Sequence, residues 1–135
     1  MAQEFYAGKI LVLGNCEMSN RVIEKVLQVY GMSLCEVDFV PYNDVCKYDF
    51  SQLIGTNKYC DVFIGPTPHK ALKLAGSSSP HQFLIDHEEY VPKVQQLRQK
   101  NGNLGISKTN FEDALLRSEK FRIETYWENE NGWLG

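Results

Sequence analysis

The sequence predicts a single α/β domain, and three observations support this fold class. Two short, almost wholly apolar runs, Lys9–Gly14 and Cys60–Gly65, each end in glycine, which is typical of strands buried on both faces of a parallel sheet. Between them lie a helix-like segment and a further strand-like run, Leu34–Tyr42. Strands that alternate with helices form parallel sheets through right-handed crossovers. We therefore expect a Rossmann-like (flavodoxin-like) three-layer domain with its parallel strands first.

The first half of the chain is expected to form a β-α-β-α-β unit. Apolar residues recur at helical spacing after the first strand; Ser19 or Asn20 can cap the start of this helix, and Gly31 can end it. Leu34–Tyr42 alternates apolar and acidic side chains, which predicts a strand with one more exposed face. A short helix capped by Asp49 then leads into the third strand.

The second half predicts an antiparallel addition to the sheet. Ser79 is a suitable cap for a helix over Pro80–Glu89, in which proline occupies the favoured first position. Two strand-like segments within residues 91–108 flank the pair Asn101-Gly102, and an Asn-Gly pair between such runs is the strongest short signal for a hairpin. Because the strands of a hairpin are antiparallel, the complete sheet is expected to be mixed.

The last part of the chain is expected to be helical and then aromatic. Thr109 and Glu112 have the spacing of a capping box ahead of an apolar run, and Phe121–Trp127 could add an edge strand. Tyr126, Trp127 and Trp133 lie near glutamates, and exposed aromatic residues of this kind indicate a surface for self-association, as in a homodimer or another homo-oligomer. They could equally close the core over one face.

Length and composition restrict the possible functions. A chain of 135 residues is the size of one domain, 1–135, and 43% apolar with 23% charged residues is ordinary for a globular protein. A net charge of −3 with mixed signs gives no broad basic face, so nucleic acid is not expected as a partner. The N-terminal residues lack the pattern of a signal peptide, and no run is apolar enough to span a membrane. We expect a cytoplasmic protein with no membrane partner and no cofactor.

The four cysteines are expected to be reduced and structural. Cys16, Cys35, Cys46 and Cys60 form no C-x-x-C pair, so a zinc site has no local support. The cluster Asp86–Glu89 offers metal-type ligands, but consecutive helical residues point in different directions and fit a solvated helix end better. We therefore expect no metal. Cys16 stands near the start of a helix, where the pKa of a thiol can be lowered, and it is the candidate reactive thiol.

The candidate ligand site lies in the loops after the first and third strands. In an open α/β sheet, ligands bind beyond the carboxyl ends of the strands where the strand order reverses, and these two strands would flank that point. The first loop leads into a helix N-terminus, whose free N–H groups favour anions. The patterns G-x-G-x-x-G and G-x-x-x-x-G-K-[ST] are absent, so an ordinary strand-to-helix turn is the alternative. The predicted ligand-binding residues of this loop are Gly14, Asn15, Ser19 and Arg21.

The second loop, residues 65–79, is richer in polar chemistry. Pro66 and Pro68 stiffen it and give His69 a rigid mount, and Lys70 and Lys73 share a face if a helical turn forms. Serines and the start of a helix follow, so a phosphate or carboxylate would meet positive charge and oriented donors. A solvated loop with a capping serine is the alternative. The predicted ligand-binding residues of this loop are Gly65, Thr67, His69, Lys70, Lys73, Ser77, Ser78 and Ser79.

Three functions remain open. The preferred hypothesis is binding of a small phosphorylated or nucleotide-like anion between the two loops, which needs only donors and positive charge. The second is a hydrolase or transferase acting on a phosphorylated small molecule or a nucleoside, with His69 as the catalytic acid or base because imidazole titrates near neutrality. Asp38, Asp44 or Glu17 could orient that imidazole, and His81 follows on the same segment. The third is a protein-interaction module that uses the aromatic C-terminal segment.

Overall fold

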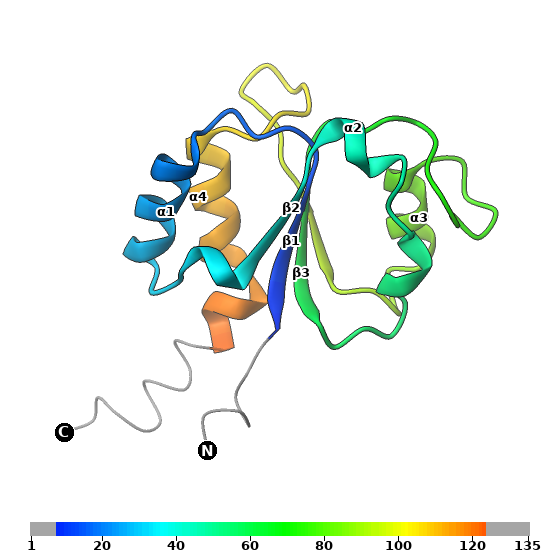
Figure 1. Cartoon of the computed structure of the whole chain (residues 1–135), viewed down its shortest axis with the longest axis horizontal. Coiled ribbons are helices and arrows are strands. Elements are labelled where there is room, and N and C mark those ends of the chain that lie inside the picture. The colour runs from blue at the N-terminus through cyan, green and yellow to red at the C-terminus, as the bar shows by residue number, and fades with distance from the viewer. Residues whose placement is uncertain (1–7, 124–135) are drawn as a thin grey trace.

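The computed structural model of this chain describes residues 8–123 and has three layers, with helices on both faces of one sheet (Figure 1). The strands are β1 Lys9–Leu13, β2 Val37–Val40, β3 Tyr59–Ile64 and β4 Lys93–Gln96. The helices are α1 Asn20–Val29, α2 Tyr42–Val45, α3 Pro80–Asp86 and α4 Lys108–Arg117, with 3-10 turns η2 Leu34–Glu36 and η3 Phe50–Leu53. α1 and α4 lie on one face of the sheet, while α2 and α3 lie on the other.

All four strands of the sheet are parallel, in the order β2-β1-β3-β4. The predicted α/β class and the parallel β-α-β-α-β unit are therefore confirmed. The prediction of a mixed sheet with a C-terminal antiparallel hairpin was wrong, because the fourth strand joins β3 as a parallel strand.

The pair Asn101-Gly102 lies at a chain reversal within the loop after β4 and does not connect two strands of the sheet. Gly102 has a φ of +88°, and the reversal makes one isolated antiparallel bridge. The returning chain lies on the β3 side, since the Gly105 N–H donates to the Leu97 carbonyl at 3.0 Å and Ile106 lies against Gly65. It therefore runs across the carboxyl ends of the inner strands and away from the outer edge of β4.

Two apolar cores form on the two faces of the sheet because side chains alternate along each strand. Ile10 and Val12 of β1 pack with residues of α1 and α4, whereas Leu11 and Leu13 pack with residues of η3 and α3. All four side chains are fully buried, which explains why this strand is apolar throughout.

The first helix begins and ends as predicted, while two other elements are shorter. The Ser19 hydroxyl caps α1, and Gly31 follows its end with a φ of +77°. The second strand is restricted to Val37–Val40 because the η2 turn precedes it. The third helix ends at Asp86 and not at Glu89.

The C-terminal elements differ more from the prediction. Ser107, and not Thr109, caps α4, and its capping box is completed by Asn110. Residues 119–123 are helical, so the predicted edge strand at Phe121–Trp127 is wrong at its start, and the rest of it lies outside the described residues.

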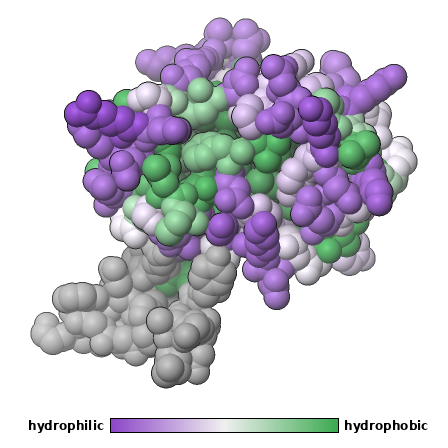
Figure 2. Space-filling view, in the orientation of Figure 1, coloured by the Kyte–Doolittle hydropathy of each residue, from purple (hydrophilic) through white to green (hydrophobic). Residues whose placement is uncertain are grey.

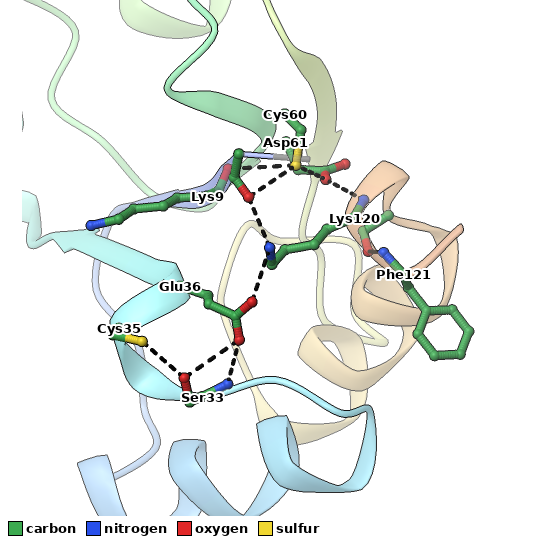
Figure 3. A network of polar contacts seen from close by, with 10 residues as sticks. Lys9, Ser33, Cys35, Glu36, Cys60, Asp61, Lys120 and Phe121 are labelled. Carbon is green, nitrogen blue, oxygen red and sulfur yellow. Dashed lines mark hydrogen bonds and ion pairs between the residues drawn. The ribbon is translucent and has the colours of Figure 1, made fainter. Parts of the chain in front are cut away.

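A buried polar cluster ties this last helical turn to the start of the sheet (Figure 3). Asp61 of β3 is fully buried, and its carboxylate oxygens accept the N–H groups of Glu119 and Lys120 at 2.9 and 3.0 Å. The Lys120 ammonium, 2% exposed, pairs with Glu36 at 3.0 Å and donates to the Gly8 carbonyl at 2.9 Å. We call this cluster the C-terminal clasp; it gives hydrogen-bond partners to charges that burial would otherwise penalise strongly.

Candidate functional site

The strand order reverses between β1 and β3, as predicted, so the loops after these two strands meet at the centre of the carboxyl edge. Tight packing closes this point. Gly14 has a φ of +110°, and a Cβ there would lie 2.5 Å from the Pro66 carbonyl oxygen. Ile106 packs against Gly65 and makes a parallel bridge with Cys16. The loop after β4 therefore occupies the space between the two candidate loops, and both glycines permit a close approach of neighbouring atoms.

An open pocket of about 370 Å³ lies beside this closed point, between the loop after β1, the start of α1 and the end of β2. Its volume falls in the range of about 300–1,000 Å³ that is usual for small-molecule sites. Hydrophobic side chains gather over β2 and the space beside α1, with hydrophilic ones around them (Figure 2). We call this the α1 pocket; its lining includes Gly14, Asn15, Met18, Asn20, Phe39 and Pro41.

Some of the polar residues predicted in the first loop form hydrogen bonds within the fold, while others have donor groups without a partner in the described part of the chain. The Asn15 side chain accepts the Tyr42 N–H at 3.0 Å and fixes the loop to the start of α2, while the Ser19 hydroxyl caps α1. Arg21 is exposed on the first turn and forms no ion pair with another described residue. Within residues 8–123, the backbone N–H groups of Asn20 and Arg21 have no acceptor, as expected for a helix start.

Cys16 also lines the α1 pocket, but its thiol is not activated. Burial raises the pKa of the thiol, the charge of Glu17 acts in the same direction, and a hydrogen bond from the Met18 backbone does not reverse the shift. A protonated thiol is a poor nucleophile. The hypothesis of a reactive Cys16 therefore has no support from its surroundings.

The second loop, residues 65–79, forms no helix and lies against η3. Leu72 makes a parallel bridge with Asp49, whose carboxylate is 4.0 Å from the Lys73 ammonium. His69 and Lys70 are exposed and have no hydrogen-bond or charge partner among the described residues. Since the loop contains no acidic residue, its lysines make it a positively charged segment beside the carboxyl edge of the sheet.

Some hydroxyl groups of this loop form hydrogen bonds with other described residues and others do not. Ser79 caps α3, and Ser77 donates to the Asp86 carboxylate at 2.7 Å. Ser78 is exposed. The Thr67 hydroxyl is buried and has no hydrogen-bond partner among the described residues. Ser78 therefore keeps an exposed hydroxyl group that a ligand could bind, whereas the Thr67 hydroxyl is enclosed by the fold and Ser77 and Ser79 stabilise it.

His81, which was not among the predicted ligand residues, has a hydrogen-bond partner at each ring nitrogen. Its Nε2 lies 3.1 Å from the Gly65 carbonyl oxygen, and its Nδ1 lies 3.2 Å from the Gln96 side-chain amide nitrogen. Because a carbonyl only accepts, Nε2 carries the proton and Nδ1 accepts from Gln96. Arg98 in turn donates to the Gln96 amide oxygen at 3.0 Å. Burial outweighs the hydrogen bond to Gly65 and lowers the pKa of His81, so the ring is neutral at neutral pH.

His81 stands at one end of a second groove, of about 390 Å³, between α3 and β4. Ile85 and Val94 are among the apolar residues along it; Gln96 lies with His81 at the end of β4, and Glu88 lies at the other end. We call this the α3–β4 groove. It is separate from the α1 pocket, since the two share no lining residue.

No grouping of histidine, cysteine, aspartate and glutamate within residues 8–123 could hold a metal ion. The same part of the chain has no helix with the length and apolar character needed to cross a membrane. Compared with known protein families, curated proteins and solved structures, the chain matches none of them. Its function therefore has to be inferred from the two larger cavities, the α1 pocket and the α3–β4 groove, and from the loops around them.

Proposed function

We propose that this chain is a Rossmann-like domain that binds a small phosphorylated or nucleotide-like anion at the carboxyl edge of its sheet. The observation that carries the proposal is the α1 pocket, which joins a helix N-terminus to an apolar wall. The strand order β2-β1-β3-β4 supports it, because open α/β sheets bind ligands beside the point where the order reverses.

The anion would bind at the start of α1. This helix is ten residues long and has no acidic residue in its first turn, so its dipole favours a negative charge there by about 0.3–1 kcal/mol. The backbone N–H groups of Asn20 and Arg21 are suitable donors, and the Arg21 guanidinium can add charge-assisted hydrogen bonds. A phosphate bound here would thus meet both oriented N–H donors and a positive charge.

The remainder of the ligand would lie against Phe39 and Pro41 at the end of β2. Phe39 is half-buried, so one part of its ring is available to a planar group such as a nucleobase. Lys70 and His69 of the second loop would contribute positive potential that attracts the anion.

Thermal unfolding with a matched set of ligands tests the proposal: inorganic phosphate, ribose 5-phosphate, adenosine and adenosine monophosphate. A ligand present at 100 times its Kd should stabilise the protein by about 2.7 kcal/mol. We expect adenosine monophosphate to raise the Tm most and adenosine to raise it least. If none of the four raises the Tm at millimolar concentration, the proposal is wrong.

Arg21→Ala and Phe39→Leu separate the proposed charge contact, made by a residue next to the lining residue Asn20, from the apolar wall of the pocket. Arg21→Ala should weaken every phosphorylated ligand by about tenfold, the equivalent of about 1.4 kcal/mol, whereas Phe39→Leu should weaken adenosine monophosphate and leave ribose 5-phosphate unchanged. Lys25→Ala is the control, because Lys25 is exposed on α1 one turn further along. Equal losses in Arg21→Ala and Lys25→Ala would indicate non-specific charge attraction.

The hydrolase or transferase alternative stays a prediction. Two of the three carboxylates suggested to orient His69 make other contacts: Asp38 accepts from the Tyr59 hydroxyl at 2.6 Å, and Glu17 accepts from the Gln99 amide at 2.8 Å. The third, Asp44, is exposed. Turnover of a phosphorylated substrate that is lost in His69→Ala would favour this alternative over simple binding.

The interaction-module alternative rests on Tyr126, Trp127 and Trp133, which lie outside the described residues, and it also stays a prediction. Deleting residues 128–135 and measuring the solution mass tests it: an unchanged mass would remove these residues from self-association.

A further inference from the structure

The outer edge of β4 is open to another strand. Within residues 8–123, β4 is the outermost strand on its side of the sheet and pairs with β3 alone. The Leu97 N–H donates to the Ile64 carbonyl at 2.9 Å, so the N–H and C=O groups of Val94 and Gln96 point away from β3. Among residues 8–123, no backbone group pairs with them. Such an edge is a template for pairing with a further chain.

Apolar surface accompanies these unpaired backbone groups, because the α3–β4 groove runs along the same edge. Ile85 on the groove wall is 55% exposed, and Val94 is half-buried. On the other face of β4, the Gln95 amide donates to the Ala114 carbonyl of α4 at 2.9 Å, and a smaller cavity of about 200 Å³ lies between β4 and α4. The larger of the two hollows beside this edge is therefore the groove on the α3 face.

The charge along this edge changes sign from one end to the other. Glu88 borders the groove beside Pro92, at the start of β4. Arg98 lies just past the end of the strand, where it donates to the Gln96 side chain. The Lys93 ammonium at the start is turned to the opposite face, where it donates to a carbonyl of α4. Two copies of this edge are complementary in charge when they run antiparallel, because each acidic start then meets a basic end.

We propose that two copies of this chain associate through β4, antiparallel, so that their sheets become continuous. A two-fold axis at Gln95 sets Val94 of one copy opposite Gln96 of the other, and their outward N–H and C=O groups then pair. The same register brings Arg98 of each copy opposite Pro92 of the other, beside Glu88. The two grooves merge along the axis and cover both Ile85 side chains. This inference does not depend on the anion site, which lies at the β1–β2 side of the sheet.

Charge reversal tests the pairing with the full chain. Glu88→Arg places two arginines opposite each other across the interface, and Arg98→Glu places two glutamates opposite each other. Because like charges repel, each variant should dimerise more weakly. Sedimentation equilibrium should give each variant a dimer Kd at least about tenfold above that of the unchanged protein. An equimolar mixture of the two variants should recover the dimer, because every Glu–Arg contact is then restored between unlike chains. Native mass spectrometry identifies that mixed dimer by its mass.

Glu24→Arg serves as the matched control, since Glu24 is exposed on α1, away from β4, and it should leave the Kd unchanged. Far-UV circular dichroism of each variant verifies that the fold is kept. Raising the salt concentration should reduce the difference between the single variants and their mixture. A monomeric unchanged protein at the highest soluble concentration would overturn the proposal, as would single variants that dimerise as well as the mixture does.

Discussion

Replacing Gly14 by alanine tests whether the contact between the two loops holds the carboxyl edge together. Gly14 has a φ of +110°, and its Cβ would lie 2.5 Å from the Pro66 carbonyl oxygen and 3.2 Å from the Gly65 carbonyl carbon. Both neighbours are backbone atoms, so no side chain can rotate away to make room. The variant must therefore strain residue 14 and separate the loops.

The size of the effect follows from these two terms. The backbone conformation costs about 1–3 kcal/mol for a residue with a Cβ, and forcing two packed segments apart adds about 1–3 kcal/mol. We expect Gly14→Ala to lower the free energy of unfolding by about 3–5 kcal/mol. Gly31→Ala is the matched control, because Gly31 also has a positive φ, +77°, but no atom lies within 4 Å of the position of its Cβ. Its loss should be about 1 kcal/mol.

Urea unfolding followed by far-UV circular dichroism measures both variants. With an m-value of about 1.5 kcal/mol/M, a difference of about 2 kcal/mol separates the two midpoints by about 1.3 M. Equal midpoints would refute the reasoning, because they would leave backbone strain as the whole effect. Gly14→Ala should also weaken ligand binding in the α1 pocket, since Gly14 forms part of its wall.

The remaining predictions concern buried polar groups. Asp61→Asn leaves one of the two N–H groups of the C-terminal clasp facing an amide NH2 group, which donates and cannot accept, and it should destabilise the protein by about 2–3 kcal/mol in urea; a negligible loss would show that the clasp is dispensable. The pKa of folded His81 lies below its unfolded value of about 6.5, so the unfolded chain binds the proton more readily and stability should fall as the pH drops below about 6.5. His81→Gln should flatten that part of the pH–stability curve, and an unchanged curve would contradict the assignment. Burial raises the pKa of Cys16, so iodoacetamide at pH 8 should modify the exposed Cys35 and Cys46 first; peptide mass spectrometry showing Cys16 first would reverse that conclusion.

The inner strands and the first helix could be predicted from the sequence because their signals are local. β1 is buried on both faces, which leaves an unbroken apolar run after Lys9. The hydroxyl of Ser19 and the positive φ of Gly31 serve α1 through contacts within a few residues. Such features need no knowledge of what lies elsewhere in the fold.

β4 could not be predicted because its partner is distant and its own signal is weak. It is a half-exposed edge strand that carries polar side chains, Lys93, Gln95 and Gln96, so no apolar run marks it. The pair Asn101-Gly102 gives a strong local signal for a chain reversal, and for this reason a hairpin strand was predicted on each side of it. The reversal is real, but parallel pairing with β3 stabilises the strand and the turn does not.

The candidate site was chosen by topology, and several side chains expected there have other roles in the fold. The strand order alone leads to the loops after β1 and β3. Ser77 and Ser79 looked like ligand donors, yet they stabilise the α3 region. Phe39 gave no signal, because a residue at the end of a strand has no periodicity that links it to a pocket. His69 was predicted as a site residue because prolines flank it in the sequence. His81 instead has a partner at each ring nitrogen, and these partners, Gly65 and Gln96, are brought to it by the fold.

The C-terminal clasp has a consequence for synthesis on the ribosome. Asp61 emerges with β3, but the N–H groups that it binds follow 58 and 59 residues later. Until residues 119 and 120 leave the exit tunnel, closing this end of the sheet would bury a carboxylate without those partners, at a cost of about 1–3 kcal/mol or more. The nascent chain should therefore stay accessible to proteases and chaperones here, and a chain that stops before residue 119 should be cleared instead of accumulating.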